Sequence, residues 1–208
     1  ALGTVCRKLL EDIGIFVGSH VTQIHHAKNT ISYDPSISPV ELNKKADASP
    51  VRCLDKKAEK EMITIIDDAK KAGDSVGGIF EVIATGLPYG LGSPMQWDRK
   101  LQAKITSMMM SVNAFKGIDI GGGMNESEKW GSEVHDEIGW ENNKYIRYSN
   151  NAGGLEGGMT NAQPIVLKMA MKPIATLIKP LRSVDMNTKE SNDAHKAVSY
   201  THLRAHET

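Results

Sequence analysis

The segment of residues 150–166, NNAGGLEGGMTNAQPIV, carries residue types suited to binding chemistry. It contains four glycines, three asparagines and a glutamine, and an alternating apolar run follows it. Glycine lets a backbone approach another group without a Cβ in the way, and backbone N–H groups placed in this manner bind anions. The segment therefore indicates either a surface loop or a backbone that lies against a ligand or another strand.

Other residues with reactive or metal-binding side chains give weaker signals. His135, Asp136 and Glu137 in GSEVHDE are of metal-ligating types, but adjacent residues point in different directions and no ligand pair at metal spacing accompanies them. We expect no metal site. Asp74 stands one residue after Gly73, which we predict to end a helix, and aspartate is common in turns. We therefore expect Asp74 to be a turn residue and not a catalytic one.

The elements that position these segments follow from hydrophobic periodicity. Strands and helices alternate in a mixed order, so the predicted class is α+β. Local signals mark the helix ends: Ser38 before Pro39 and Asp55 are N-caps, Gly73 is a stop, and Asp98 is a further cap. The predicted helices cover 2–13, a short stretch after 38, 56–72 and a stretch after 98; the predicted strands cover 15–24, 76–84, 116–120 and 165–171.

Three further expectations concern packing. The first strand should be broken near Gly18. Gly77 and Gly78 fit either tight sheet packing or a ligand contact. The three consecutive methionines that continue the helical stripe after Asp98 should pack in the core and not serve a cofactor; these are Met108, Met109 and Met110.

Composition narrows the class of protein. The chain has 208 residues, with 25 basic residues balanced by 25 acidic ones, so no bulk field attracts nucleic acid or an anionic membrane. No apolar run has the length of a membrane span. Cys6 and Cys53 are too few for a disulfide framework, and we expect a cytoplasmic protein with reduced thiols.

Five segments occur in an order that resembles the chorismate synthase family. They are DSVGGIFEVIATGLPYGLGSP, MSVNAFKGIDIG, GSEVHDE, NNAGGLEGGMTNAQPIV and MAMKPIAT. The resemblance runs from about Leu2 to about Ala197. It implies a β-α-β sandwich, usually assembled as a homotetramer. It also implies a lyase of the shikimate pathway, which converts 5-enolpyruvylshikimate 3-phosphate to chorismate and phosphate with reduced FMN.

The resemblance also assigns cofactor-binding residues. Gly157 matches one FMN-contact position of the family, and Asn113 with Ala114 matches another, where an amide side chain can bond the flavin or its ribityl chain. A third match carries a lysine charge and a threonine hydroxyl that suit a phosphate or polar tail. It comprises Lys172, Pro173, Ile174, Ala175 and Thr176. On this resemblance, the glycines of 150–166 form a surface that lies close to a flavin.

Two departures from the family pattern limit the assignment. The family's catalytic histidines and substrate-binding arginines belong to a segment that matches nothing in this chain, so no histidine here inherits a catalytic role. The string VSYTHLRAHET resembles translated sequencing adapter, and the pair His202 and His206 within it lacks the glutamate of a zinc protease. We therefore expect a fragment, inactive alone, with 1–197 belonging to one domain and 198–208 a non-native tail.

Two other classes of function compete with the lyase. The first is a non-catalytic module that binds flavin or phosphate, which would bind FMN but release no phosphate from the substrate. The second is a structural β-rich oligomerisation domain whose glycines serve sheet packing, and its thermal stability would not respond to FMN.

Overall fold

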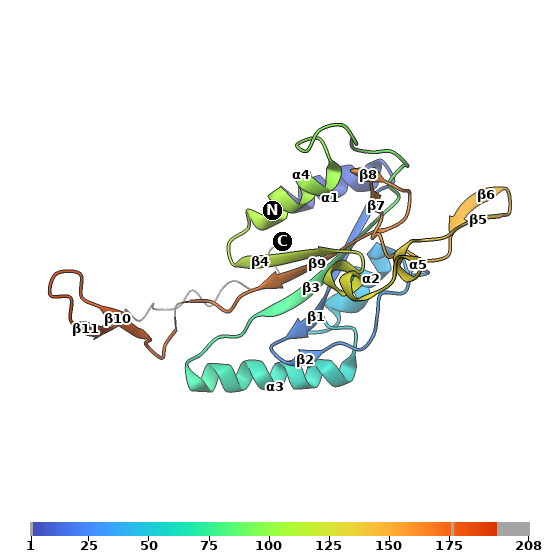
Figure 1. Ribbon diagram of the computed structural model, residues 1–208. Coiled ribbons are helices and arrows are strands. Elements are labelled where there is room, and N and C mark those ends of the chain that lie inside the picture. The colour runs from blue at the N-terminus through green and yellow to red at the C-terminus, as the bar shows by residue number, and fades with distance from the viewer. Residues whose placement is uncertain (1, 176, 195–208) are drawn as a thin grey trace.

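The computed structural model describes residues 2–175 and 177–194 and shows a mixed α+β fold. At its centre is a five-stranded sheet in the order β2-β1-β3-β9-β4, in which every neighbouring pair is antiparallel (Figure 1). The α+β prediction is confirmed. The sheet strands are β1 (Phe16–Ile24), β2 (Ala27–Lys28), β3 (Gly78–Thr85), β4 (Phe115–Ile120) and β9 (Ile165–Met171).

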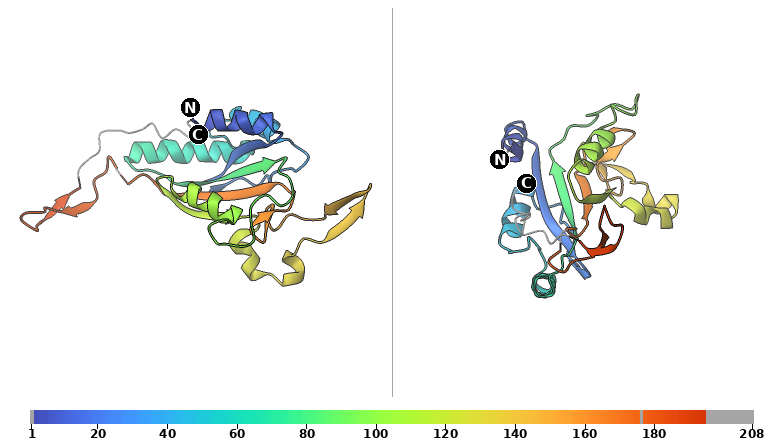
Figure 2. Two further views of the ribbon diagram at one scale, coloured as in Figure 1. Left: turned by 90° about the horizontal axis from the view of Figure 1, so that it is seen from above. Right: turned by 90° about the vertical axis from the view of Figure 1, so that its left-hand side faces the viewer.

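Helices and three small hairpins surround the sheet. The hairpins are β5 (Ile138–Glu141) with β6 (Lys144–Arg147), β7 (Leu155–Glu156) with β8 (Met159–Thr160), and β10 (Arg182–Val184) with β11 (Ser191–Asp193). The helices are α1 (Leu2–Asp12), α2 (Pro39–Asp47), α3 (Lys56–Ala72), α4 (Leu101–Met110), α5 (Gly131–Val134) and the 3-10 helix η1 (Gly123–Glu128). Figure 2 shows that β5–β6 and β10–β11 project away from the body of the molecule.

Most helix ends lie where local signals predict them. The Ser38 side chain accepts a hydrogen bond from the backbone N–H of Glu41, and the Asp55 side chain caps α3 in the same manner. Gly73 ends α3 in the left-handed conformation with φ of 67°. The Asp98 prediction is wrong, because α4 begins after Lys100 without a side-chain cap.

Two hydrophobic clusters hold the elements together. One lies between α4 and the sheet, with Leu155, Ile165 and Leu167 at its centre and Leu101 and Ile105 of α4 packed against it. The other joins α3 to the β1–β2 side of the sheet through buried Ala27, Cys53, Ala58 and Met62. Burial of such side chains is the main driving force that fixes the helices to the sheet.

The structure corrects two packing predictions. Strand β1 continues through Gly18 without a break, and a Cβ at Gly18 would lie 3.0 Å from the Cα of Pro39, so the glycine serves close packing. The methionines of α4 do not form core: Met108 is 71% exposed and Met110 42%. Helical periodicity identified the apolar stripe of α4 but could not show whether another element covers it.

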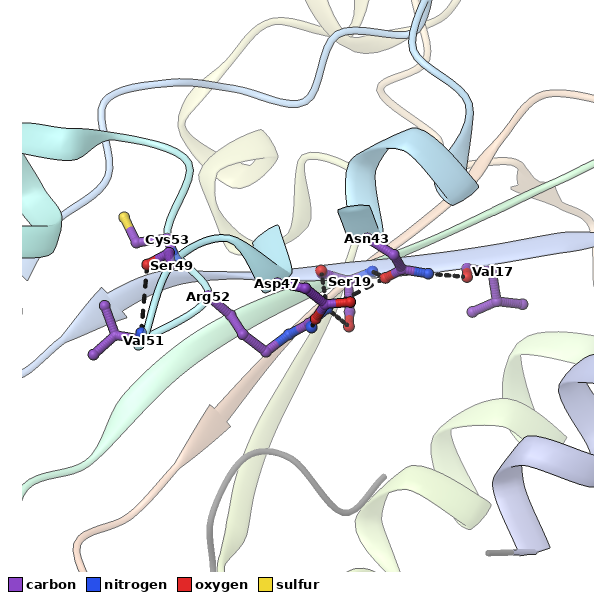
Figure 3. Close-up of polar contacts among 8 residues, drawn as sticks. All are labelled: Val17, Ser19, Asn43, Asp47, Ser49, Val51, Arg52 and Cys53. Carbon is purple, nitrogen blue, oxygen red and sulfur yellow. Dashed lines mark hydrogen bonds and ion pairs between the residues drawn. The ribbon is translucent and has the colours of Figure 1, made fainter. Parts of the chain in front are cut away.

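Side chains close the outer edge of β1 where β2 does not reach. Asn43 of α2 accepts a hydrogen bond from the backbone N–H of Ser19 and donates one to the carbonyl oxygen of Val17 (Figure 3). Arg52 donates to the carbonyl oxygen of Ser19 and forms an ion pair with Asp47. The backbone groups of an open strand edge can pair with another strand. These side chains bond them as a neighbouring strand would.

Within the described ranges, no helix is both long enough and apolar enough to cross a lipid bilayer.

Candidate functional site

Two of the three segments matched to flavin contacts meet at one end of the sheet. Met171 at the end of β9 pairs with Phe115 of β4 on one side and with Gly78 of β3 on the other. Immediately beyond this pairing, the backbone N–H of Lys172 donates to the carbonyl oxygen of Ala114 at 2.9 Å. The antiparallel topology therefore brings the Asn113–Ala114 turn against the segment that begins at Lys172.

This junction presents polar groups to solvent. Asn113 and the segment 172–175 are exposed, and Ala114 takes a left-handed φ of 73° that reverses the chain between α4 and β4. Lys172 makes no ion pair with any described residue, so its ammonium is available to an anion. Thr176 lies outside the described residues.

Ser75 holds the segment after β9 in place through a hydrogen bond. Its hydroxyl donates to the carbonyl oxygen of Ile174 at 2.7 Å. Gly77 lies beneath the same segment, where a Cβ would be 2.9 Å from Cδ of Pro173. Gly78 packs against β1, where a Cβ would be 2.5 Å from the carbonyl oxygen of Gln23. Both glycines therefore serve tight backbone packing, which is one of the two alternatives left open by the sequence.

The glycines of 150–166 lie close to the chain itself. A Cβ at Gly154 would be 2.6 Å from the carbonyl oxygen of Pro164, and one at Gly158 would be 2.6 Å from that of Ser93. Gly157 differs: it forms the β7–β8 turn with φ of 60°, and no atom lies within 4 Å of the place its Cβ would occupy. Of the pair at this turn, Gly157 alone leaves room for a ligand.

Gly157 is not brought to the Ala114–Lys172 junction. Its neighbour Gly158 accepts a hydrogen bond from the backbone N–H of Leu101 at the start of α4, whereas Asn113 follows the end of that helix. Figure 1 places the β7–β8 hairpin and the α4–β4 connection at opposite ends of α4. A flavin site that used all three matched segments could therefore not be formed at this end of a single chain alone.

Asp136 of GSEVHDE organises the start of the glycine segment. Its carboxylate accepts hydrogen bonds from the Ser149 hydroxyl and from the backbone N–H groups of Asn151 and Ala152, the last at 3.0 Å. Burial would raise the pKa of Asp136, but these donors outweigh it and the pKa lies below its usual range. The motif thus has a positioning role that sequence reasoning did not assign.

No group of three or more His, Cys, Asp or Glu side chains within 2–175 and 177–194 is arranged to hold a metal ion. One buried acid–base pair does occur elsewhere in the sheet, between His20 and Glu81. The signal in the sequence was a glutamate between Ile79 and Ile83 on one predicted strand face, although its partner could not be inferred from the pattern.

The described elements form an α+β fold with an antiparallel sheet, and the connecting segments at one end of this sheet expose an amide, an ammonium and backbone groups. The family model for chorismate synthase matches residues 1–200. The chain therefore belongs to the chorismate synthase family, and both the family and the fold expected from the sequence are confirmed.

Individual relatives agree with the family assignment. Chorismate synthase of Listeria welshimeri is 52% identical over 195 residues, which are 93% of this chain and 50% of the relative. Chorismate synthase 1 of Bacillus cereus is 54% identical over 191 residues, 91% of this chain and 48% of the relative. A crystal structure of chorismate synthase superimposes with a TM-score of 0.76 at 43% identity, over 83% of this chain and 54% of that one. The chain spans about half the length of these relatives.

Proposed function

We propose that this chain is part of a chorismate synthase, which converts 5-enolpyruvylshikimate 3-phosphate to chorismate and phosphate with reduced FMN. The observation that carries the proposal is the Ala114–Lys172 junction. Two segments that are distant in the sequence, and that were matched independently to flavin contacts, are joined there by a backbone hydrogen bond.

The residues at the junction fit the polar part of FMN. Lys172 supplies an exposed cation for a phosphate, and Asn113 supplies an amide that donates and accepts. The Ser75 hydrogen bond to Ile174 holds the intervening backbone in place. When bound, reduced FMN would supply electron density to the carbon–oxygen bond that breaks, while the residues of this chain bind and orient it.

Gly157 belongs to the same proposal at a different place. Its open surroundings allow a flavin to approach the β7–β8 turn. This turn and the Ala114–Lys172 junction lie at opposite ends of α4, so another part of the complete protein must complete the flavin contact at Gly157. The homotetramer implied by the family resemblance provides such parts, and we propose it for the complete protein. The catalytic groups are assigned to no residue of this chain.

The test uses the full-length protein that contains this chain, or a chimera in which Listeria welshimeri chorismate synthase supplies the remaining length. Under anaerobic conditions with reduced FMN, it should release inorganic phosphate from 5-enolpyruvylshikimate 3-phosphate at a rate that depends on FMN. Tight FMN binding without phosphate release would instead support the non-catalytic flavin-binding module. Thermal stability that does not respond to FMN would support the structural oligomerisation domain.

A further inference from the structure

The segment that follows β9 is attached to a part of the chain that is distant in the sequence. This post-β9 segment (residues 172–175) lies against the α3–β3 connection (residues 73–77), which leads into the neighbouring strand of the sheet. The hydroxyl of Ser75 donates to the carbonyl oxygen of Ile174 at 2.7 Å, and 99 positions separate the two residues. This hydrogen bond therefore couples the post-β9 segment to the connection that enters β3.

The end of α3 attaches the chain a few residues further on. The backbone N–H of Lys179 donates to the carbonyl oxygen of Gly73 at 3.0 Å. Gly73 ends α3 with φ of 67°, and a Cβ on it would lie 3.2 Å from the Cβ of Ile178. Two hydrogen bonds thus tie the chain after β9 to the same connection.

Pro173 stiffens the backbone between Lys172 and Ile174. The proline ring fixes its own φ, and it restricts the preceding residue, Lys172, to extended conformations. Gly77 leaves room for this ring, because a Cβ on Gly77 would be 2.9 Å from Cδ of Pro173. Since the backbone from Lys172 to Ile174 is stiff, holding the carbonyl group of Ile174 also limits where the Lys172 side chain can point.

The opposite side of the post-β9 segment is attached independently. The backbone N–H of Lys172 donates to the carbonyl oxygen of Ala114 at 2.9 Å, just beyond the pairing of β9 with β4. This bond joins backbone atoms and does not involve the Ser75 side chain. Removal of the Ser75 hydroxyl therefore releases one side of the segment and leaves the strand pairing in place.

We propose that Ser75 is a positioning residue for the phosphate of FMN, an inference that rests on the proposed function. Its hydroxyl holds the backbone at Ile174, and this places the ammonium of Lys172 where the phosphate binds. Ser75 itself contacts no part of the flavin. The ring system and the ribityl chain are assigned to Asn113 and Gly157, so the effect of Ser75 is confined to the phosphate.

The experiment compares FMN with riboflavin, which is FMN without its phosphate, by fluorescence titration of the complete protein that contains this chain. Ser75→Ala should weaken FMN binding about fivefold, because it removes one hydrogen bond, and should change riboflavin binding by less than about twofold. Ser75→Thr retains the hydroxyl and should bind FMN as the unmodified protein does.

Ser127 provides a matched control. Its hydroxyl also donates to a backbone carbonyl oxygen, that of Met124, at 2.8 Å, but within η1. Ser127→Ala should leave the affinities for both flavins unchanged. The comparison of flavins separates positioning from a general structural effect, because a general effect would weaken FMN and riboflavin in equal proportion.

The inference is overturned if Ser75→Ala binds FMN like the unmodified protein, if it loses affinity for both flavins equally, or if Ser75→Thr binds FMN as weakly as Ser75→Ala. Each of these outcomes leaves the flavin site of the proposed function standing, because the unmodified protein still binds FMN. An unmodified protein that binds neither flavin contradicts the proposed function, and the inference falls with it.

Discussion

The backbone N–H of Lys172 donates a 2.9 Å hydrogen bond to the carbonyl oxygen of Ala114, just beyond the last pairing of β9 with β4. This bond extends the strand ladder into the two connecting segments that follow and precede the strands. The rigid sheet thus positions an amide and a lysine that neither segment would hold on its own.

Substitution of Gly157 tests the open turn. The φ of 60° costs a β-branched residue about 1–2 kcal/mol, and a new side chain would occupy the space that we assign to flavin. Gly157→Val in the complete protein should therefore lower both FMN affinity and the unfolding temperature. Gly157→Asn tolerates the left-handed turn, so it should lower FMN affinity with a smaller effect on stability. Unchanged FMN binding by Gly157→Val would remove this residue from the site.

Asp136 should stabilise the glycine segment. Asp136→Ala removes an ionised acceptor from three donors, and we expect the free energy of unfolding to fall by about 2 kcal/mol. Amide hydrogen exchange at Asn151 and Ala152 should accelerate. Asp74→Ala is the matched control, because the Asp74 carboxylate bonds only the neighbouring backbone N–H of Ser75 among the described residues. Equal exchange rates in both variants would contradict the positioning role.

The cap of α3 predicts a defined pH dependence. Hydrogen bonds from Thr30, Lys57 and Ala58 lower the pKa of Asp55 to about 2, from 3.8. Because the folded-state pKa is the lower one, the carboxylate contributes stability above pH 3.8 that is lost as the pH falls toward about 2. The stability difference between the unmodified chain and Asp55→Ala, measured by urea unfolding, should shrink over that window. A constant difference from pH 6 to pH 2.5 would contradict this cause.

Two methionines provide a matched test of burial. Met62 of α3 is fully buried, and Met62→Ala should lower the free energy of unfolding by about 2–5 kcal/mol. Met108 of α4 is 71% exposed, and Met108→Ala should change it by less than about 0.5 kcal/mol. Urea unfolding of the two variants of this chain measures both. Similar losses would mean that α4 is covered in the folded chain.

Local sequence signals correctly predicted the helix ends that depend on neighbouring residues. Ser38 and Asp55 bond the first backbone N–H groups of their helices, and Gly73 ends α3. Each acts on groups only a few residues away, so the sequence was sufficient to predict these helix ends. The start of α4 depends on a distant partner, because the carbonyl oxygen of Gly158 accepts from the backbone N–H of Leu101. Nothing near Asp98 could reveal that bond.

The candidate site shows the same division. Motif matching predicted the segments at Asn113 and Lys172, but only the strand order β3-β9-β4 showed that they meet. The bond from Ser75 to Ile174 joins segments far apart in the sequence and left no local pattern. The glycines at 153–158 were predicted to approach something closely, and for Gly154 and Gly158 that partner is the chain's own backbone.

The most direct measurement of the central claim is an FMN titration of the complete protein, followed by quenching of flavin fluorescence. Lys172→Met is compared with Lys144→Met, a control at the first residue of β6 that is equally charged and also exposed. The account predicts that Lys172→Met weakens FMN binding about tenfold, because it removes a charge-assisted contact, and that the control binds normally. Equal FMN affinity in the two variants would contradict a flavin site at the Ala114–Lys172 junction.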